Sequence, residues 1–346
     1  MSETITTIVP THGRPQLLKR ALRSVLRQTY GDFKLCIYDN ASDDDTPDVV
    51  REVASGDSRV VYFRHHANIG GAANFLFGMT RVDTPYFSFL SDDDVLLPDF
   101  FETAIAGFAQ APGALMSAAS TVEVDELGAP LYEPLALWSR AGVFEAPSGA
   151  FAMLGNRHPT WTTALFKREA IDRIGLLDLE VGAPSDLDFE LHLAACAPIV
   201  VSKRACGAYV RHAAAHAVGE TAEVAAGFAR ISDKLAVDQR IEPAARDRLV
   251  ARVQRQLRWK LVEICVKGLV RGDDTVAHDA ALAMRDRYGP RIAGGLLLAV
   301  WHACTAAAPF RGMLRAIERA RLRMRARTSS AIDPNRLAAL HEALAL

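Results

Sequence analysis

The stretch Phe89-Leu90-Ser91-Asp92-Asp93-Asp94-Val95-Leu96-Leu97-Pro98 places three consecutive carboxylates directly after an apolar, β-type run. A strand that ends in clustered aspartates presents oxygen ligands at the carboxyl edge of a sheet, where open α/β folds bind their ligands. Hard cations such as Mg²⁺ and Mn²⁺ are held by one or two carboxylates together with substrate phosphates. This stretch therefore predicts a metal-bridged nucleoside-diphosphate site.

A structural alternative exists for the same residues, because aspartate also caps helices and tolerates turns. Pro98 and Asp99, followed by apolar residues, are typical of a helix start, which would make one aspartate a plain cap. The triplet alone leaves both interpretations open, and the rest of the chain has to decide between them.

Strand and helix patterns alternate through the first hundred residues. β-Branched and aromatic runs predict strands, and apolar residues at helical spacing predict helices. The alternation predicts an α/β fold with a Rossmann-like, mostly parallel sheet sandwiched by helices. The predicted strands are Thr4–Val9, Lys34–Tyr38, Val60–Phe63, Tyr86–Leu90, Thr160–Phe166 and Ile199–Lys203. The predicted helices are Pro15–Gln28, Thr46–Ala54, Gly71–Thr80, Arg168–Ile174 and Asp186–Ala197, with a loop-rich connection over 125–160.

The composition is that of a globular protein, since half of the 346 residues are hydrophobic, 23% are charged and the net charge is −1. A net charge near zero gives no general case for nucleic-acid binding. The five cysteines are scattered without a CxxC pair, which argues against a disulfide framework or a zinc site and fits a reducing cytosol.

The N-terminus lacks a signal-peptide pattern, and the apolar stretch Ile292–Phe310 is too interrupted to predict a transmembrane helix. We therefore expect a cytoplasmic protein.

Loops after the first three predicted strands hold further candidate ligand residues. At Val9–Pro15 a helix start presents backbone N–H groups and its dipole to an anion, and Arg14 is either a phosphate contact or an exposed arginine. Asp39 ends the second strand, where it could accept a hydrogen bond from a base or a ribose. Gly70 and Gly71 permit close backbone approach to a ligand. Neither a GxGxxG nor a P-loop pattern is present, which counts against nicotinamide and P-loop enzymes.

Five short motifs follow one another at plausible spacings: Ile8–Thr11, Ser24–Tyr30, Tyr38–Ser42, Asn68–Gly70 and Ser91–Asp94. In this combination they resemble glycosyltransferase family 2, the inverting nucleotide-sugar transferases of GT-A fold. The resemblance covers roughly the first two thirds of the chain. It implies a GT-A fold and metal-dependent transfer from a UDP- or dTDP-sugar to a glycan or lipid-linked acceptor, in bacterial surface polysaccharide synthesis.

The resemblance also implies roles for individual residues. Thr11 and Asp39 match positions that hold the nucleoside base, Asp92 matches the ribose contact, and Asp93 matches the ligand of Mg²⁺ or Mn²⁺. The full set of nucleotide-binding residues expected in this way is Pro10, Thr11, Arg14, Asp39, Asn68, Gly70, Asn74 and Asp92.

The second half of the expected site comes from later in the chain. Trp161, with the two threonines after it, resembles the acceptor-side segment of the family. Asp186 matches the catalytic base, which must lie within hydrogen-bond reach of the acceptor hydroxyl, and Asp188 is the alternative on the same acceptor side. A plain cap at the start of an amphipathic helix is the structural alternative for Asp186.

His212 resembles the last family element, where a histidine completes the metal or diphosphate site. Arg211 is either a diphosphate contact or a solvated arginine. His216 lies four residues after His212, as in some zinc sites, but no third ligand pattern supports zinc.

The chain departs from the family pattern at two positions. Many members carry aspartate where this chain has Ser91, and arginine where it has Ala73. These changes leave room for a catalytically inactive GT-A-like scaffold or a carbohydrate-binding protein, although Asp93, Asp186 and His212 argue against it. A sugar nucleotidyltransferase is a third hypothesis, but the first loop is a poor version of the Gly-rich, basic loop of those enzymes.

After a catalytic domain over residues 1–218, the chain predicts a helical C-terminal region over 219–346. Arg311, Arg315 and Arg319 share one helical face next to the apolar Ile292–Phe310. Such a basic helix either docks on an anionic membrane, here the inner face of the plasma membrane, or packs on the catalytic domain with a solvated arginine face. Self-association as a homo-oligomer is the third possibility.

Overall fold

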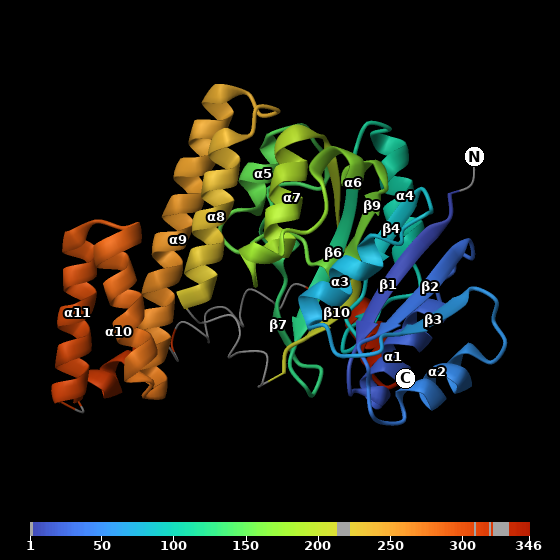
Figure 1. Cartoon of the computed structure of the whole chain (residues 1–346), viewed down its shortest axis with the longest axis horizontal. Helices are drawn as coiled ribbons and strands as arrows, with labels where there is room; N and C mark the ends of the chain where they lie inside the picture. The colour runs from blue at the N-terminus through green and yellow to red at the C-terminus, as the bar shows by residue number, and fades with distance from the viewer. Residues whose placement is uncertain (1–2, 213–221, 308, 318–319, 321–331) are drawn as a thin grey trace. The chain divides into compact units, whose positions relative to one another are not determined.

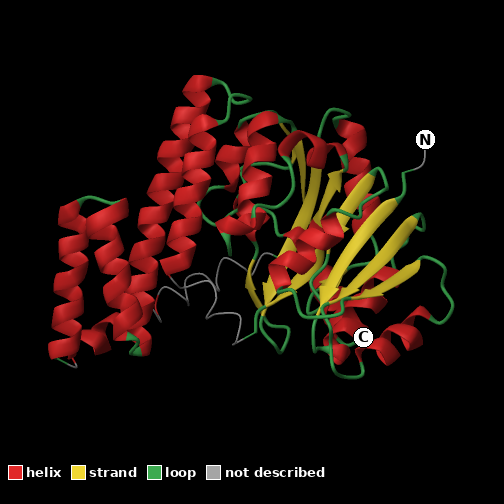
Figure 2. Ribbon diagram, in the orientation of Figure 1, coloured by secondary structure: helices red, strands yellow, loops and turns green. Residues whose placement is uncertain are grey.

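The computed structural model describes residues 3–212, 222–307, 309–317, 320 and 332–346. Over this part of the chain, sheet-forming segments are followed by a set of long helices (Figures 1 and 2). The chain divides into two compact units. The first comprises Met1–Leu179, Phe189–Arg211 and Ala331–Leu346, and the second comprises Glu180–Asp188 and His212–Ser330.

The first unit alternates strands and helices as the sequence predicts. Its first half contains β1 (Ile5–Thr11), α1 (Pro15–Leu26), β2 (Phe33–Asp39), α2 (Thr46–Ala54), β3 (Val60–Arg64), α3 (Gly71–Met79) and β4 (Tyr86–Phe89). It continues with β5 (Val95–Leu96), α4 (Phe100–Gln110), β6 (Met116–Val124), β7 (Pro130–Tyr132), η1 (Pro134–Leu137), β8 (Gly142–Phe144) and α5 (Ser148–Met153). The remaining elements are η2 (Trp161–Thr163), β9 (Ala164–Lys167), α6 (Glu169–Ile174), the later part of α7 (Ser185–Cys196), β10 (Ile199–Val210) and α13 (Pro334–Leu344). Most of η3 (Leu179–Val181) and the first turn of α7 are grouped with the second unit.

The described strands form one ten-stranded sheet in the order β3-β2-β1-β4-β9-β6-β10-β5, with β7 beside β6 and β8 beside β10. The neighbouring strands β3, β2, β1 and β4 are parallel. β9 is antiparallel to both β4 and β6, so β6 runs in the same direction as β4. β10 is parallel to β6. The short strands β5, β7 and β8 run against their neighbours. The mostly parallel α/β fold expected from the sequence is confirmed.

Helices cover both faces of the sheet (Figure 2), because alternate residues of each strand point to opposite sides. Ile5 and Val9 of β1 lie in a core cluster with Leu22 of α1. Ile8 points to the other face and meets α3 at Gly78, where an added Cβ would lie only 2.5 Å from the Ile8 Cγ2 atom. This glycine lets α3 lie close against the strands whose ends form the site.

Two strands differ from the sequence prediction. β6, which lies between β9 and β10, was not predicted, because all of its residues are buried and show no polar alternation. The strand expected at Thr160–Phe166 begins instead as the short helix η2, and only Ala164–Lys167 joins the sheet. The loop-rich connection over 125–160 contains the short elements β7, η1, β8 and α5.

The last described helix, α13, belongs to the first unit, whereas the sequence predicts one C-terminal region over 219–346. Leu340 of α13 is fully buried in a cluster with Val122 of β6 and Val210 of β10. The Arg336 guanidinium donates to both carboxylate oxygens of Asp99, at 3.0 and 2.8 Å. The end of the chain is therefore a structural part of the sheet-containing unit.

The second unit is helical, as expected for most of this region. It contains α8 (Ala222–Val237), α9 (Pro243–Arg271), α10 (Asp274–Ala283), the π-helical turn Met284–Tyr288, α11 (Arg291–Ala306) and a further helix, Pro309–Ile317. In α9, Leu249, Val253, Leu257 and Leu261 recur every four residues and form its buried side. Among the described helices, none alone has the length and hydropathy of a membrane span; Arg291–Ala306 and Pro309–Ile317 pass that test only together, as a pair bent by 119°.

Candidate active site

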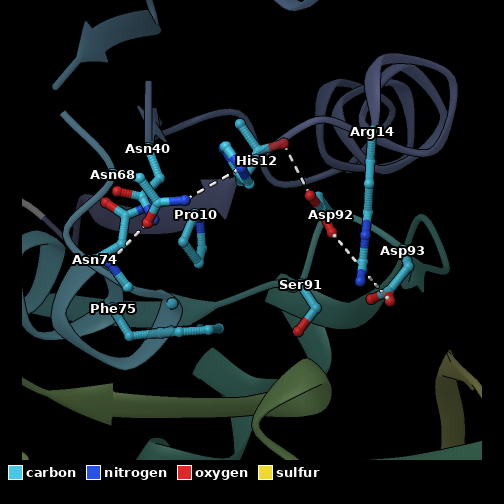
Figure 3. A pocket seen from close by; sticks show the side chains of 13 residues that line it. Pro10, His12, Arg14, Asn40, Asn68, Asn74, Phe75, Ser91, Asp92 and Asp93 are labelled. Carbon is cyan, nitrogen blue, oxygen red and sulfur yellow. Dashed lines mark hydrogen bonds and ion pairs between the residues drawn. The ribbon is translucent and has the colours of Figure 1, made fainter. Parts of the chain in front are cut away.

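A pocket of about 530 Å³ opens at the carboxyl edge of the parallel strands (Figure 3). The register places Thr11 at the end of β1 opposite Asp39 at the end of β2, and the acidic loop follows β4 on the other side of β1. The pocket is lined by Pro10, Thr11, His12, Arg14, Asn40, Asn68, Gly70, Gly71, Asn74, Phe75, Ser91, Asp92 and Asp93. All of these residues come from the first unit. The segments that follow the four strands β1, β2, β3 and β4 thus meet at one edge of the sheet.

Asp92 is held by the end of β1. The Thr11 hydroxyl donates to Asp92 Oδ2 at 2.8 Å, and Arg14 lies 3.4 Å from Asp92 Oδ1. Burial raises the pKa of the Asp92 carboxyl and the nearby Asp93 charge adds to this, while Thr11 and Arg14 act in the opposite direction. Thr11 and Arg14 therefore fix the Asp92 carboxylate at the pocket wall.

Asp93 is the aspartate that already faces a cation. An Nη atom of Arg14 lies 2.9 Å from Asp93 Oδ2, and Arg20 of α1 donates to the Asp93 backbone carbonyl at 2.5 Å. Burial lowers the pKa of Arg20, while the charges of Asp94 and Asp93 raise it. Arg14, just before α1, and Arg20, in the middle of α1, thus hold the acidic loop in place, the first at a side chain and the second at the backbone.

Asp94, the third aspartate of the triplet, has a structural role that the sequence does not reveal. Its carboxylate is buried and accepts from the Thr162 hydroxyl at 2.6 Å and from the Val210 backbone N–H at 3.0 Å. Burial raises the pKa of Asp94 well above its usual value, and the neighbouring Asp93 charge acts in the same direction. Asp94 ties the acidic loop to η2 and to the end of β10.

The opposite wall of the pocket is a turn organised by side-chain amides. Asn40 donates to the Asn68 side-chain carbonyl at 2.8 Å and accepts from the Ile69 N–H at 2.8 Å. The Asn68 amide also contacts His12 Nε2 at 3.1 Å (Figure 3). Gly70 has φ of +89°, a conformation that favours glycine, and it leads into the N-terminus of α3. Helix N-termini attract anions, so this wall suits a phosphate.

Two residues predicted to bind the nucleotide are held mainly by protein contacts. Asn74 lines the pocket but is almost fully buried; its amide donates to the Tyr38 carbonyl at 2.7 Å. Asp39 is fully buried and is absent from the described pocket lining. Its Oδ1 accepts from Ser42, and its Oδ2 accepts from the Tyr62 hydroxyl at 2.5 Å. In this structure Asp39 orders the edge of the pocket rather than facing it.

The residues expected on the acceptor side lie outside this pocket lining. Trp161 stacks on Phe89, with ring centroids 4.2 Å apart, and its ring edge meets Phe75, which lines the pocket. Asp186 is partly exposed in the first turn of α7. Asp188 is buried and forms an ion pair with Lys234 of α8, which gives it a structural contact inside the second unit.

The expected metal or diphosphate residues after β10 are not in the pocket lining either. Arg211 forms an ion pair with Glu123 at the end of β6. His212 is partly buried and is grouped with the second unit, and His216 lies outside the described residues. Within the described part of the chain, groups of three or more His, Cys, Asp or Glu side chains that could hold a metal ion are absent.

The oxygen atoms that the pocket offers as metal ligands nevertheless fit a divalent cation. Asp92 and Asp93 offer hard oxygen ligands on one wall, and the Arg14 guanidinium shows that a positive charge is already accommodated between them. Mg²⁺ and Mn²⁺ need few protein ligands when substrate phosphates supply the rest. The residues that would hold the ion are therefore Asp93, with Asp92 beside it.

Four pocket residues received no ligand role in the sequence prediction: His12, Asn40, Phe75 and Ser91. His12, Asn40 and Ser91 adjoin predicted ligand residues, so their position after strand ends was an available signal. Phe75 follows Asn74 on α3, and its position in the pocket depends on how α3 packs on the sheet.

Residues 6–175 match the model of glycosyl transferase family 2. This part of the chain belongs to that family. A β-1,3-glucosyltransferase of Campylobacter jejuni, named for GalNAc(5)-diNAcBac-PP-undecaprenol, is 33% identical over 100 residues, which cover 29% of this chain and 32% of that protein. Glycosyltransferase GlyA of Streptococcus pneumoniae is 27% identical over 104 residues, which cover 30% of this chain and 15% of that protein. The matched region thus spans less than a third of either relative.

Solved structures of glycosyltransferases share the fold. S. aureus TarS in complex with UDP-GlcNAc aligns with a TM-score of 0.63 at 15% identity, over 91% of each chain. The mannosyltransferase PcManGT of Pyrobaculum calidifontis, in complex with GDP-Man and Mn²⁺, aligns with a TM-score of 0.54 at 16% identity, over 94% of this chain and 85% of that one. The likeness shows that the chain has the GT-A fold of glycosyltransferases.

Proposed function

We propose that this family 2 protein is an inverting glycosyltransferase that moves a sugar from a nucleoside-diphosphate sugar to an acceptor hydroxyl. The observation that carries the proposal is the pocket at the carboxyl edge of the sheet. There Asp92 and Asp93 line the same pocket as Gly70 and Gly71, where α3 begins. An acidic wall suits a cation and ribose hydroxyls, and a helix N-terminus suits a diphosphate.

Three pocket residues have distinct roles in this proposal. Asp92, fixed by Thr11, accepts hydrogen bonds from the donor's ribose, and Arg14 reaches the diphosphate once it is released from the carboxylates. A Mg²⁺ or Mn²⁺ ion on Asp93 would neutralise charge on the leaving diphosphate. This role for the ion is supported by the paired carboxylates and by the Mn²⁺ named with a neighbour of the same fold.

Asp186 is the proposed catalytic base. It takes the proton from the acceptor hydroxyl, whose oxygen bonds to the anomeric carbon as the bond from that carbon to the diphosphate breaks, which inverts the configuration. Its support is its place in the first turn of α7, where its side chain is partly exposed.

The donor and acceptor classes are also part of this proposal. We favour a UDP- or dTDP-sugar donor and a glycan or lipid-linked acceptor in bacterial surface polysaccharide synthesis. The solved TarS complexes name UDP and UDP-GlcNAc, and the Campylobacter relative is named for a polyprenol-linked acceptor. Cytoplasmic action, which the scattered free cysteines favour, belongs to the same proposal.

Thermal-shift binding of UDP, dTDP, GDP and CDP, each with and without Mn²⁺, tests the proposal. A ligand at 100 times its dissociation constant stabilises the folded state by about 2.7 kcal/mol, which shifts the melting temperature measurably. Mn²⁺-dependent stabilisation by one nucleotide is the expected result and names the donor class. Stabilisation by none of them would overturn the proposal, and a shift with glycans alone would instead support a carbohydrate-binding protein.

A further inference from the structure

The outward side of α11 is apolar. Ile292, Leu296 and Val300 recur every four residues and are 80%, 64% and 40% exposed. The sequence contains no charged side chain from residue 292 to residue 310. A helix at the surface of a soluble protein ordinarily turns charged or polar residues outward. α11 therefore presents to solvent the kind of surface that helices usually bury.

The helix Pro309–Ile317 repeats this arrangement. Phe310, Met313 and Ile317 have the spacing of one helix face and are 49%, 55% and 56% exposed. We call these six residues, Ile292, Leu296, Val300, Phe310, Met313 and Ile317, the apolar face. Exposed apolar residues gathered on neighbouring elements mark a contact site, whereas scattered ones are ordinary.

The inward sides of both helices are attached to the same corner of the second unit. Trp301 of α11 donates its indole N–H to the Asp274 carbonyl at 2.9 Å. Arg311 forms an ion pair with the Asp274 carboxylate at 2.7 Å, and Arg315 donates to the Val270 carbonyl at 3.0 Å. These contacts fix the rotation of each helix and hence which residues point outward.

The same contacts correct an expectation from the sequence. Arg311, Arg315 and Arg319 were predicted to share one helix face, either docked on a membrane or solvated. Arg311 and Arg315 instead reach back to the junction of α9 and α10, and Arg319 lies outside the described residues. The exposed side chains Phe310, Met313 and Ile317 of this helix are apolar.

The surrounding sequence is strongly basic. Residues 284–331 contain ten arginines and two acidic residues, a formal charge of +8, whereas the whole chain carries −1 and the remainder therefore −9. Among the described residues, Arg287 and Arg291 are exposed just before the apolar face begins. Such a separation of charge within one chain directs the basic part toward an anionic partner.

We infer that the apolar face docks into the interfacial region of an anionic lipid membrane. Apolar side chains of an interfacial helix enter the boundary between headgroups and acyl chains, while arginines at its edges contact acidic headgroups. A second copy of the chain suits the surface less well, because a two-fold contact would bring two segments of charge +8 together. Membrane docking does not depend on the proposed transferase activity. Only the advantage that docking would give the enzyme, access to a lipid-linked acceptor, rests on the proposed function.

Flotation of the full chain with lipid vesicles, in the absence of nucleotide, tests this inference. We expect the protein to float with vesicles that contain phosphatidylglycerol, and less with phosphatidylcholine alone. The double substitution Leu296→Gln and Met313→Gln should weaken partitioning by about tenfold or more, because polar groups replace the inserted side chains. Leu127→Gln, at a residue 93% exposed in the first unit, is the matched control and should float like the wild type.

Circular dichroism melting establishes whether each variant is folded. If the double variant is unfolded, the single substitution Ile292→Gln, at the most exposed position of the apolar face, replaces it in the flotation experiment. Failure of the intact chain to float with phosphatidylglycerol vesicles would overturn the inference, as would equal flotation of wild type and variants. A dimer in sedimentation that dissociates on Leu296→Gln, without flotation of the wild type, would assign the face to a second copy instead. Nucleotide binding, measured separately, is unaffected by any of these results.

Discussion

The guanidinium of Arg14 lies 2.9 Å from Oδ2 of Asp93 and 3.4 Å from Oδ1 of Asp92 (Figure 3). The first helix of the sheet-containing unit thus supplies a positive charge to the two carboxylates that are proposed to hold a divalent ion. The arginine side chain is half exposed, so it can turn from this position toward solvent. If Asp92 and Asp93 hold the proposed ion, Arg14 competes with it for the same oxygens in the absence of nucleotide.

Replacement of Arg14 by glutamine is expected to tighten Mn²⁺ binding in the absence of nucleotide. Partly exposed ion pairs contribute about 0.2–1 kcal/mol, and removal of the positive charge also ends its repulsion of the ion, so we expect a gain of about three- to tenfold. Electron paramagnetic resonance titration of free Mn²⁺ measures this directly. Arg27→Gln removes an exposed charge at the other end of α1 and should leave Mn²⁺ binding unchanged. Weaker Mn²⁺ binding in Arg14→Gln would contradict the competition.

Asp93→Ala is expected to remove Mn²⁺-dependent nucleotide binding while the protein stays folded. Even residues that only support metal ligands change metal affinity by about 10–100-fold, so loss of the ligand itself should exceed that range. Isothermal titration with the nucleotide identified by thermal shift, with and without Mn²⁺, is the measurement. Asp83→Ala, which removes an exposed carboxylate at the start of β4, is the control. Unchanged Mn²⁺ dependence would exclude Asp93 as the ligand.

Asp186→Asn is expected to lower turnover by about 10²–10⁴-fold, the usual contribution of a general base, with donor affinity unchanged. The substitution keeps the size of the side chain and removes its ability to take a proton. Turnover is measured with donor at saturation, and donor affinity is measured separately by titration. Asp172→Asn, at an exposed position on α6, provides the comparison. Full turnover in Asp186→Asn would show that another group takes the proton.

Asp94 offers a prediction about stability and pH. Because burial raises its pKa in the folded protein, the charged carboxylate at neutral pH disfavours folding, and this penalty disappears as the pH falls toward the raised pKa. Asp94→Asn removes the charge and can still accept from the Val210 N–H, so its free energy of unfolding at pH 7 should equal or exceed that of the wild type.

This advantage over the wild type should become smaller when urea unfolding is repeated at pH 5, because the wild-type carboxyl is protonated more often at lower pH. Asp94→Ala, in contrast, leaves the Val210 N–H and the Thr162 hydroxyl without their acceptor and should lower the free energy of unfolding by about 1–3 kcal/mol. If Asp94→Asn were as unstable as Asp94→Ala at both pH values, the charge of Asp94 would be a stabilising feature rather than a penalty.

The sequence predicts the local parts of this site well and its long-range parts poorly. The alternation of strands and helices places Thr11, Gly70 and Asp93 at one sheet edge, and all three line the pocket. Asp39 also ends a strand, but its carboxylate is covered by Tyr62 of the next strand, a contact that depends on side-chain packing and not on local pattern. β6 escaped prediction because a strand buried on both faces lacks the alternation that reveals a strand.

The docking of α13 is the extreme case of a long-range contact, since Arg336 and Asp99 are 237 residues apart. Arg336 donates to Asp99 and to the Ala205 carbonyl, and both charged side chains are largely buried. Burial alone would raise the pKa of Asp99, but Arg336 and Arg204 more than offset it, so the pKa is lowered. A lowered pKa means that this carboxylate stabilises the fold at neutral pH, and that the contribution is lost as the pH falls below the ordinary value of 3.8.

Arg336→Met keeps the length of the side chain but removes its charge and its donors. We expect it to lower the free energy of unfolding of the sheet-containing unit at pH 7 by about 1.5–3 kcal/mol, the range for hydrogen bonds to charged groups. The difference from the wild type should shrink in acid, where Asp99 becomes protonated. Arg51→Met, whose partner Asp48 is exposed, should change stability by less than about 0.5 kcal/mol. If the two variants were equally stable in urea unfolding, α13 would be a dispensable attachment rather than part of the unit that builds the site.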